Sequence, residues 1–172
     1  MKIDQITIDR ISLLHPKIRE EVEDIYTSQI APALTGNSFC RFAYTLRTFA
    51  EQNDMYAQGR TRLFDTNGKR LGKITNCKGG QSYHQYGVAL DIVLIDRINA
   101  SWNISVDYDG DGKADWMEVV EIFKNNGWTW GGGFKTFKDF PHFEKTFGYN
   151  WRDLLIKYNN KDFISGTNYV SI

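Results

Sequence analysis

The residues whose types are suited to metal chemistry are His84, Asp91 and His142. Asp91 lies in a run of apolar residues, where a carboxylate is costly to bury unless a cation pairs with it. Gly87 can turn the chain so that His84 reaches back over the face from which Asp91 projects. His142 is preferred over His15 as the third ligand, because His15 precedes a proline at a predicted helix start and is expected to be exposed.

Two histidines and one carboxylate leave one position of a tetrahedral zinc ion open, which is typical of a catalytic rather than a structural site. Such an ion activates water and polarises a peptide carbonyl. Asp139, three residues before His142, is the candidate general base, since a carboxylate that does not bind the metal can accept a proton and pass it to the leaving amine. These residues together predict hydrolysis of a peptide bond.

The segment Ser82–Asp91 has the pattern SxHxxGxAxD and resembles the signature of the M15 peptidases. That family includes D-Ala-D-Ala carboxypeptidases and L-alanyl-D-glutamate endopeptidases of phage lysis systems. The segment Asp139–His142 is similar to the family's element of an acidic residue three positions before a histidine. The resemblance implies that His84, Asp91 and His142 bind zinc and that Asp139 is the catalytic carboxylate.

Three other pieces between about residues 47 and 147 resemble the same family. Arg47 and Gln52 match a helix in which the family's arginine lies at the active site, so Arg47 is expected to stabilise the oxyanion or to hold a substrate carboxylate. From the residue type alone, an arginine on a helix surface is the alternative. Ser82 is expected to hydrogen-bond a metal ligand, and Trp130 begins a tryptophan-glycine turn that the resemblance places beside the cleft.

A second metal site is predicted between Asp107 and Glu118, which fit the calcium-loop pattern at every specified position. The flanks fit less well, because residues 101–106 are predicted to form a strand and Ala114 stands where a bulky apolar residue is usual. The alternative is an acidic, solvated turn that caps the next helix. The candidate calcium residues are Asp107, Asp109, Asp111, Lys113, Asp115 and Glu118.

The elements that must position these residues follow from hydrophobic periodicity. Helices are predicted at residues 15–30, 42–58, 116–126 and 151–158, a strand at 87–95, a short extended piece within 139–147 and a loop at 63–80. This order predicts an α+β fold with a small antiparallel sheet flanked by helices. By the resemblance it is similar to hedgehog domains and D-Ala-D-Ala peptidases, and residues 1–172 are expected to form a single domain.

Composition restricts the partners. The chain has 21 basic and 21 acidic residues, so no global field attracts nucleic acid or an anionic membrane, and no apolar run is long enough to span a bilayer. Cys40 and Cys77 form no CxxC pair and are expected to be free thiols. We expect a monomer that binds a peptidoglycan stem peptide.

The N-terminal stretch is charged where a signal peptide would be apolar. This favours synthesis in the cytoplasm and action on the cell wall after release, as a prophage endolysin with L-alanyl-D-glutamate endopeptidase activity. The alternatives are a D-Ala-D-Ala carboxypeptidase and a catalytically inactive wall-binding module that keeps the zinc. A calcium sensor is disfavoured, because one loop gives no paired EF-hand.

Overall fold

The strand that carries Asp91 lies inside an antiparallel sheet. This strand, β2 (Ala89–Asp96), pairs with β1 (Ser38–Tyr44) along one edge and with β3 (Asn99–Ser101) and β5 (His142–Glu144) along the other. The strand β4 (Thr129–Trp130) pairs with β5 and completes the order β1-β2-β5-β4. The computed structural model describes residues 2–172.

The chain divides into two compact units. Unit 1 consists of the described residues up to Leu46 together with Val88–Lys145, and unit 2 consists of Arg47–Gly87 and Thr146–Ile172. Unit 1 contains the sheet. The single-domain prediction is not tested by this division and stays a prediction.

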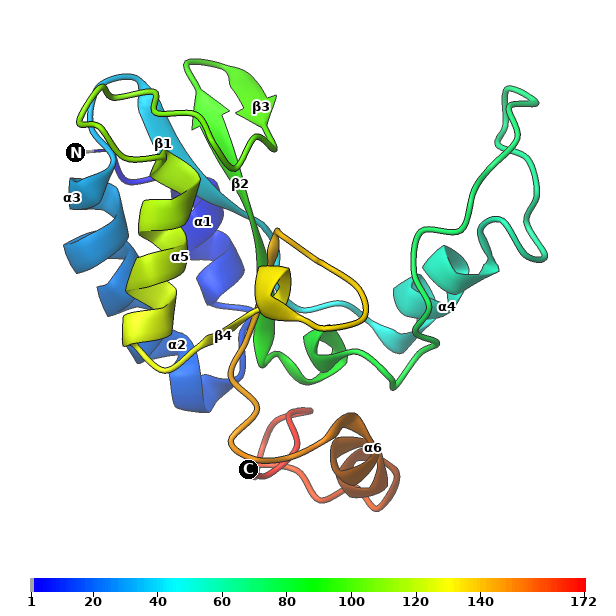
Figure 1. The fold of residues 1–172 in the computed structure, drawn as a ribbon. Coiled ribbons are helices and arrows are strands. Elements are labelled where there is room, and N and C mark those ends of the chain that lie inside the picture. Colours follow the sequence, from blue (N-terminus) through cyan, green and yellow to red (C-terminus); the bar gives the residue numbers. More distant parts are fainter. Residues whose placement is uncertain (1) are drawn as a thin grey trace. The chain divides into compact units, whose positions relative to one another are not determined.

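Helices cover one face of the sheet in unit 1. They are α1 (Gln5–Ile11), α2 (Pro16–Asp24), which continues as a π-helix (Ile25–Ile30) into α3 (Ala31–Ala33), and α5 (Asp115–Asn125) (Figure 1). Between them and the sheet lies an aromatic core in which Phe123 packs against Phe143 of β5 at 4.7 Å and Phe42 of β1 at 6.0 Å between ring centroids. On β2, Leu90, Ile92 and Leu94 are fully buried on one face, while Val93 packs into a separate cluster with Phe39 and Ile95.

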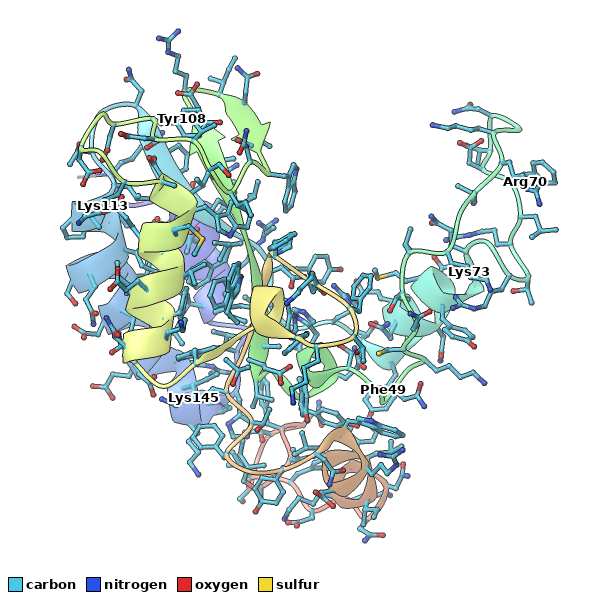
Figure 2. The ribbon with its side chains drawn as sticks, viewed as in Figure 1. Phe49, Arg70, Lys73, Tyr108, Lys113 and Lys145 are labelled. Carbon is cyan, nitrogen blue, oxygen red and sulfur yellow. The ribbon has the colours of Figure 1, made fainter. Side chains whose placement is uncertain are left out.

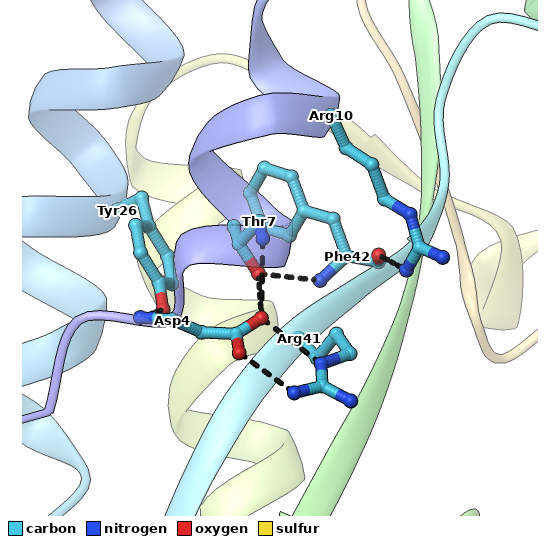
Figure 3. A network of polar contacts seen from close by, with 6 residues as sticks. All are labelled: Asp4, Thr7, Arg10, Tyr26, Arg41 and Phe42. Carbon is cyan, nitrogen blue, oxygen red and sulfur yellow. Dashed lines mark hydrogen bonds and ion pairs between the residues drawn. The ribbon is translucent and has the colours of Figure 1, made fainter.

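A polar network fastens α1 to the sheet (Figure 3). Asp4 is the N-cap of α1, where its side chain accepts hydrogen bonds from the Thr7 backbone and hydroxyl. The same carboxylate binds Arg41 of β1 through two hydrogen bonds of 2.7 and 3.0 Å. The Tyr26 hydroxyl accepts from the Asp4 backbone N–H. One buried acid therefore connects a helix start, a strand and the π-helix.

Unit 2 is built around an aromatic cluster. Phe49, labelled in Figure 2, begins α4 (Phe49–Ala57). It stacks on Tyr158 of α6 (Trp151–Asn159) with ring centroids 4.4 Å apart. It also meets Tyr86 edge to face, at the end of a 3-10 helix (Tyr83–Tyr86). Gly80 lies in the left-handed region, and a Cβ there would be 2.8 Å from the side chain of Leu155. The cluster thus fixes the loop that precedes the 3-10 helix.

The predicted α+β class, with a small antiparallel sheet flanked by helices, is confirmed, but three local predictions are wrong. Residues 42–44 belong to β1 and not to a helix, since α4 begins only at Phe49. Of residues 101–106, only Ser101 lies in a strand. His15 is fully buried at the N-cap of α2, where its Nδ1 accepts the Lys17 N–H. In residues 2–172, no helix is long and apolar enough to cross a membrane.

Candidate metal centre

Asp91 and His142 lie opposite each other on the neighbouring strands β2 and β5. They are direct partners in the antiparallel register, so their side chains project from the same face of the sheet. His142 Nδ1 is 3.2 Å from Asp91 Oδ1, and the two side chains are only 10% and 20% exposed. The partner that the partly buried Asp91 carboxylate requires is therefore supplied in part by His142.

Glu144 holds the other nitrogen of the same imidazole. Residues two apart on a strand share a face, and Glu144 Oε2 lies 3.0 Å from His142 Nε2. The nitrogen that faces Asp91 is the one that can share a cation with Asp91, while Nε2 can donate its hydrogen to Glu144. A carboxylate in this position fixes the tautomer and orientation of a metal-binding histidine. Sequence reasoning missed Glu144, although the His-x-Glu spacing within an extended piece was the available signal.

The charge on His142 is controlled by these two carboxylates. Burial disfavours the imidazolium, but the hydrogen bonds and charges of Asp91 and Glu144 outweigh burial and raise the pKa of His142 to about 9. In the metal-free protein His142 is therefore protonated at neutral pH. A metal ion that binds Nδ1 must displace that proton, as is usual when histidine becomes a ligand.

The turn that carries Asp139 is folded tightly against Gly131. The Asp139 N–H donates to the Gly131 carbonyl oxygen at 3.1 Å, and the His142 N–H donates to the Asp139 carbonyl oxygen at 3.2 Å. A Cβ on Gly131 would lie 2.4 Å from the Asp139 carbonyl oxygen and 3.1 Å from the Cβ atoms of both Asp139 and His142. The half-buried Asp139 and the buried His142 thus leave the backbone beside the same glycine, which no other residue can replace without moving the turn.

The Trp130 ring packs against the backbone of the same turn, at Gly132. Its indole Nε1 donates to the Phe140 carbonyl oxygen at 2.7 Å, and a Cβ on Gly132 would lie 2.2 Å from its ring. The tryptophan-glycine-glycine sequence is therefore explained by close packing of the ring on the backbone. Phe137 and Phe140 remain 64% and 38% exposed on this loop. That Trp130 contacts substrate stays a prediction.

In unit 2, Arg47 and Gln52 form a buried network that supports the backbone of His84. Arg47 Nη1 donates to Gln52 Oε1 at 2.9 Å, and the Arg47 backbone N–H donates to the His84 carbonyl oxygen at 3.1 Å. Gln85, a residue that sequence reasoning missed, connects Gln52 to the backbone N–H of Ser82. Arg47 is only 8% exposed and precedes the helix. The alternative of an arginine on a helix surface is therefore wrong.

His84 itself lies in the 3-10 helix, which ends at Gly87 in the left-handed conformation, with φ of 70°. The predicted turn at Gly87 is confirmed, and His84 is buried. His84, Asp91 and His142 make up one of the sets of histidine and acidic side chains that can hold a metal ion, with one ligand atom from each residue.

The predicted calcium residues fall into two further acidic sets. In each, the candidate ligand atoms lie within 4.8 Å of one another, and the sets are Asp107, Asp109 and Asp115, and Asp109, Asp111 and Glu118. Lys113 bonds through its backbone N–H to Asp111 at the loop that Tyr108 and Lys113 mark in Figure 2. Asp115 is fully buried and accepts from the Ser38 hydroxyl and the Tyr108 N–H.

Glu118 differs from the other acids of this loop. Its Oε2 is buried without a hydrogen-bond partner. Burial and the charges of Asp111 and Asp109 raise the pKa of Glu118 to about 7. A cation between these carboxylates would offset both the burial and the repulsion.

The chain is similar in sequence to known peptidases over the segment that contains His84, Asp91 and His142. Residues 75–145 match the M15 peptidase family model described as D-alanyl-D-alanine carboxypeptidase. Over 99 residues the chain is 44% identical to the peptidoglycan L-alanyl-D-glutamate endopeptidase CwlK of Bacillus subtilis (strain 168). The aligned segment covers 57% of this chain and 55% of that protein. The chain therefore spans about half the length of this curated relative.

A solved structure has a similar fold. The crystal structure of the Serratia marcescens L-Ala D-Glu endopeptidase ChiX superposes with a TM-score of 0.53 at 22% sequence identity, over 89% of this chain and 92% of that one. At this identity the likeness concerns the fold alone. It agrees with the α+β architecture of helices on an antiparallel sheet.

Proposed function

We propose that this protein is a zinc-dependent peptidase of the M15 family that cuts the L-alanyl-D-glutamate bond of peptidoglycan stem peptides, since residues 75–145 match the M15 peptidase family model. The observation that carries the proposal is the pair of Asp91 and His142 on adjacent strands, 3.2 Å apart. It lies in the part of the chain that matches the family. The choice of bond rests on the 44% identity to an endopeptidase.

The donor set fits zinc. Imidazole nitrogen and carboxylate oxygen are both zinc ligands, and three protein ligands leave a position open for catalysis. His84, Asp91 and His142 would hold the ion, and Glu144 would orient His142 through Nε2. When bound, zinc supplies Lewis-acid activation of water and of the scissile carbonyl.

The other steps belong to side chains of this chain. Asp139, which leaves the backbone beside His142, accepts a proton from the attacking water and passes it to the leaving amine. Arg47 is a permanent cation that stabilises the oxyanion or holds a substrate carboxylate. Ser82 and Gln52 help to position His84, because they belong to the hydrogen-bond network that supports its backbone.

Digestion of purified peptidoglycan, with mass spectrometry of the new termini, tests the reaction. We expect new N-terminal D-glutamate and C-terminal L-alanine. Release of terminal D-alanine alone would identify the carboxypeptidase alternative, and zinc binding without any cleavage would identify the inactive module. Endolysin-type release, a prophage origin and the monomeric state stay predictions of the sequence.

The Asp139→Asn variant tests the mechanism. We expect kcat to fall by at least about 100-fold, because general acid-base catalysis typically contributes that much, while zinc content and folding are retained. Asp24→Asn, the same change at an exposed site on α2, is the matched control and should keep full activity. Undiminished cleavage by Asp139→Asn, with cleavage lost in His84→Ala, would show that another group moves the proton.

A second candidate property is calcium binding by the loop Asp107–Glu118. It is supported by the complete ligand pattern and by the unpartnered, buried oxygen of Glu118. The ion would join the loop to the first turn of α5, because Glu118 lies in that turn. Its role would be structural, and it is separate from the zinc residues.

A further inference from the structure

A marked excess of positive charge lies in a hairpin of unit 2, residues 60–78, here called the basic hairpin (Figure 1). It contains six basic residues and one acid, Asp65, whereas the whole chain balances 21 against 21. The rest of the chain is consequently net acidic. A neutral protein thus carries a local cationic segment that its composition hides.

The backbone of the basic hairpin is held by its own contacts. At its base, a Cβ on Gly59 would lie 2.5 Å from the backbone of Gly72, so the two arms approach too closely for a side chain at that position. At its tip, the Asp65 carboxylate accepts the backbone N–H groups of Asn67 and Lys69. Asp65 therefore stabilises the turn and is engaged with the backbone rather than with the neighbouring cations.

The cations fall into two groups. In the first group, Arg60 contacts the Tyr56 carbonyl and ring, Lys78 lies over the same ring, and Arg62 pairs with Asp54 at 3.0 Å. Lys69, Arg70 and Lys73 are exposed, and within residues 2–172 none of these three side chains forms an ion pair. Arg70 and Lys73 lie on the arm that returns from the tip (Figure 2). Three cations within five residues are thus available to a ligand.

We propose that the basic hairpin binds a polyanion of the cell wall, a polymer with repeating phosphodiester groups that is attached to peptidoglycan. The proposal rests on the proposed function, which places the substrate of this protein in the wall. Phosphodiesters match the fork of Arg70 and the point charges of Lys69 and Lys73. Leu63, Phe64 and Ile74, which are 45 to 57% exposed between the cations, can cover the carbon segments between phosphates.

The tip of the basic hairpin argues against a membrane as the partner. It reads Asp65-Thr66-Asn67-Gly68, and all four residues are polar or lack a side chain. An inserting loop would carry its apolar residues at the tip, but here they lie on the two arms. Bilayer insertion would also bury the Asp65 carboxylate. A hydrated polyanion that lies along the arms requires neither an apolar tip nor burial of the Asp65 carboxylate.

The test is binding of the full chain to purified peptidoglycan that retains its phosphodiester polymer, compared with the same material after chemical removal of that polymer. The variant carries Lys69→Gln, Arg70→Gln and Lys73→Gln. The matched control carries Arg97→Gln, Lys124→Gln and Lys161→Gln, which removes the same number of exposed lysines and arginines outside the basic hairpin. Cleavage of a soluble stem peptide is measured for all three proteins.

We expect the hairpin variant to bind polymer-bearing wall about tenfold more weakly at low salt, as three exposed charge contacts would give. On stripped wall, the hairpin variant and the unmodified chain should bind equally. The control variant should bind polymer-bearing wall as tightly as the unmodified chain does. Equal losses in both variants, or full binding of the unmodified chain to stripped wall, would overturn the proposal. So would hairpin-dependent binding to phosphatidylglycerol vesicles or to duplex DNA that exceeds binding to the wall.

Cleavage of the soluble peptide separates the two proposals. If the unmodified chain binds the polymer through the hairpin but cleaves no peptide, the proposed function fails and the inference stands on its own binding data. If all three proteins cleave the peptide equally while the wall-binding difference is absent, the inference alone fails.

Discussion

At the scale of single residues, the candidate metal centre is explained by the free-energy cost of placing the Asp91 carboxylate among apolar residues. A carboxylate opposite a histidine on the next strand, with a second carboxylate at the far nitrogen, makes His142 a bridge between two acids. In the metal-free protein this raises the pKa of His142 to about 9, and burial opposes the shift. The same two contacts prepare the ring for a metal, since one nitrogen faces Asp91 and the other is held by Glu144.

Replacement of Glu144 by glutamine should weaken zinc binding by about 10-fold or more, the usual effect of removing a carboxylate behind a metal-binding histidine. The amide no longer attracts the Nε2 hydrogen as strongly, so the ring is less well oriented and less basic. Competition with a chromophoric chelator measures the dissociation constant. Glu121→Gln, an exposed site on α5, serves as control. An unchanged zinc affinity in Glu144→Gln would mean that Glu144 does not orient the ligand.

The sequence predicted residues of the candidate site through their chemistry. Asp91 was found because its charge is unusual in an apolar strand, and Gly87 because a turn was needed there. Glu144 and Gln85 were missed, because a carboxylate or amide behind a site has no unusual neighbours along the chain. His15 was misjudged because the burial of an N-cap histidine depends on tertiary packing, which local sequence does not report.

At the scale of elements, the wrong helix start at residue 42 has a simple cause. Phe42 and Tyr44 have the spacing of a strand, but continuous apolar and aromatic residues suit helix and strand alike. The decisive local signal is Thr48, whose hydroxyl accepts the Glu51 N–H while Glu51 accepts the Thr48 N–H. This capping box places the start of α4 at Phe49.

The calcium loop makes a prediction at the same scale. Saturation with calcium, at about 100 times its dissociation constant, should stabilise the protein by about 2.7 kcal/mol, which is about 5 to 10 °C in melting temperature for a chain of this size. Glu118→Gln should abolish most of this shift, because the ligand at loop position twelve loses its charge. Glu121→Gln, on the next turn of the same helix, should keep it.

Differential scanning calorimetry with calcium, with magnesium and with a calcium-selective chelator measures the effect. Zinc content is followed in parallel, so that loss of zinc is not taken for loss of calcium. If calcium leaves the melting temperature unchanged while zinc is retained, the loop is a solvated acidic turn that precedes α5.

At the scale of the whole molecule, composition and periodicity predicted the fold class but not how the chain is divided. The boundaries of the two units fall at Leu46, Gly87 and Lys145, where no proline-rich or glycine-rich linker marks them. Each unit combines segments distant in sequence, as in the pairing of β1 with β2 or the stacking of Phe49 on Tyr158. Such contacts form by tertiary packing, for which periodicity within one segment gives no signal.

Acid should destabilise unit 1 through Asp4, which joins α1, β1 and the π-helix. Burial alone would raise the pKa of this carboxyl, but hydrogen bonds from Arg41 and Thr7 lower it below its usual value of 3.8. A group with a lowered pKa stabilises the fold above its unfolded pKa, and this stability is lost as the pH falls through the folded pKa. We expect Asp4→Asn to cost on the order of 1 to 3 kcal/mol at neutral pH, as the loss of a charged partner does.

Urea unfolding across the acid range tests this prediction. The difference in free energy of unfolding between Asp4→Asn and the unmodified chain should be full at pH values well above 3.8 and should shrink as the pH falls below that value, because the unmodified Asp4 then becomes protonated. Asp9→Asn, an exposed acid on the same helix, should show little difference at any pH. A difference for Asp4→Asn that stays constant throughout would mean that the hydrogen-bond geometry, and not the charge of Asp4, holds α1 to the sheet.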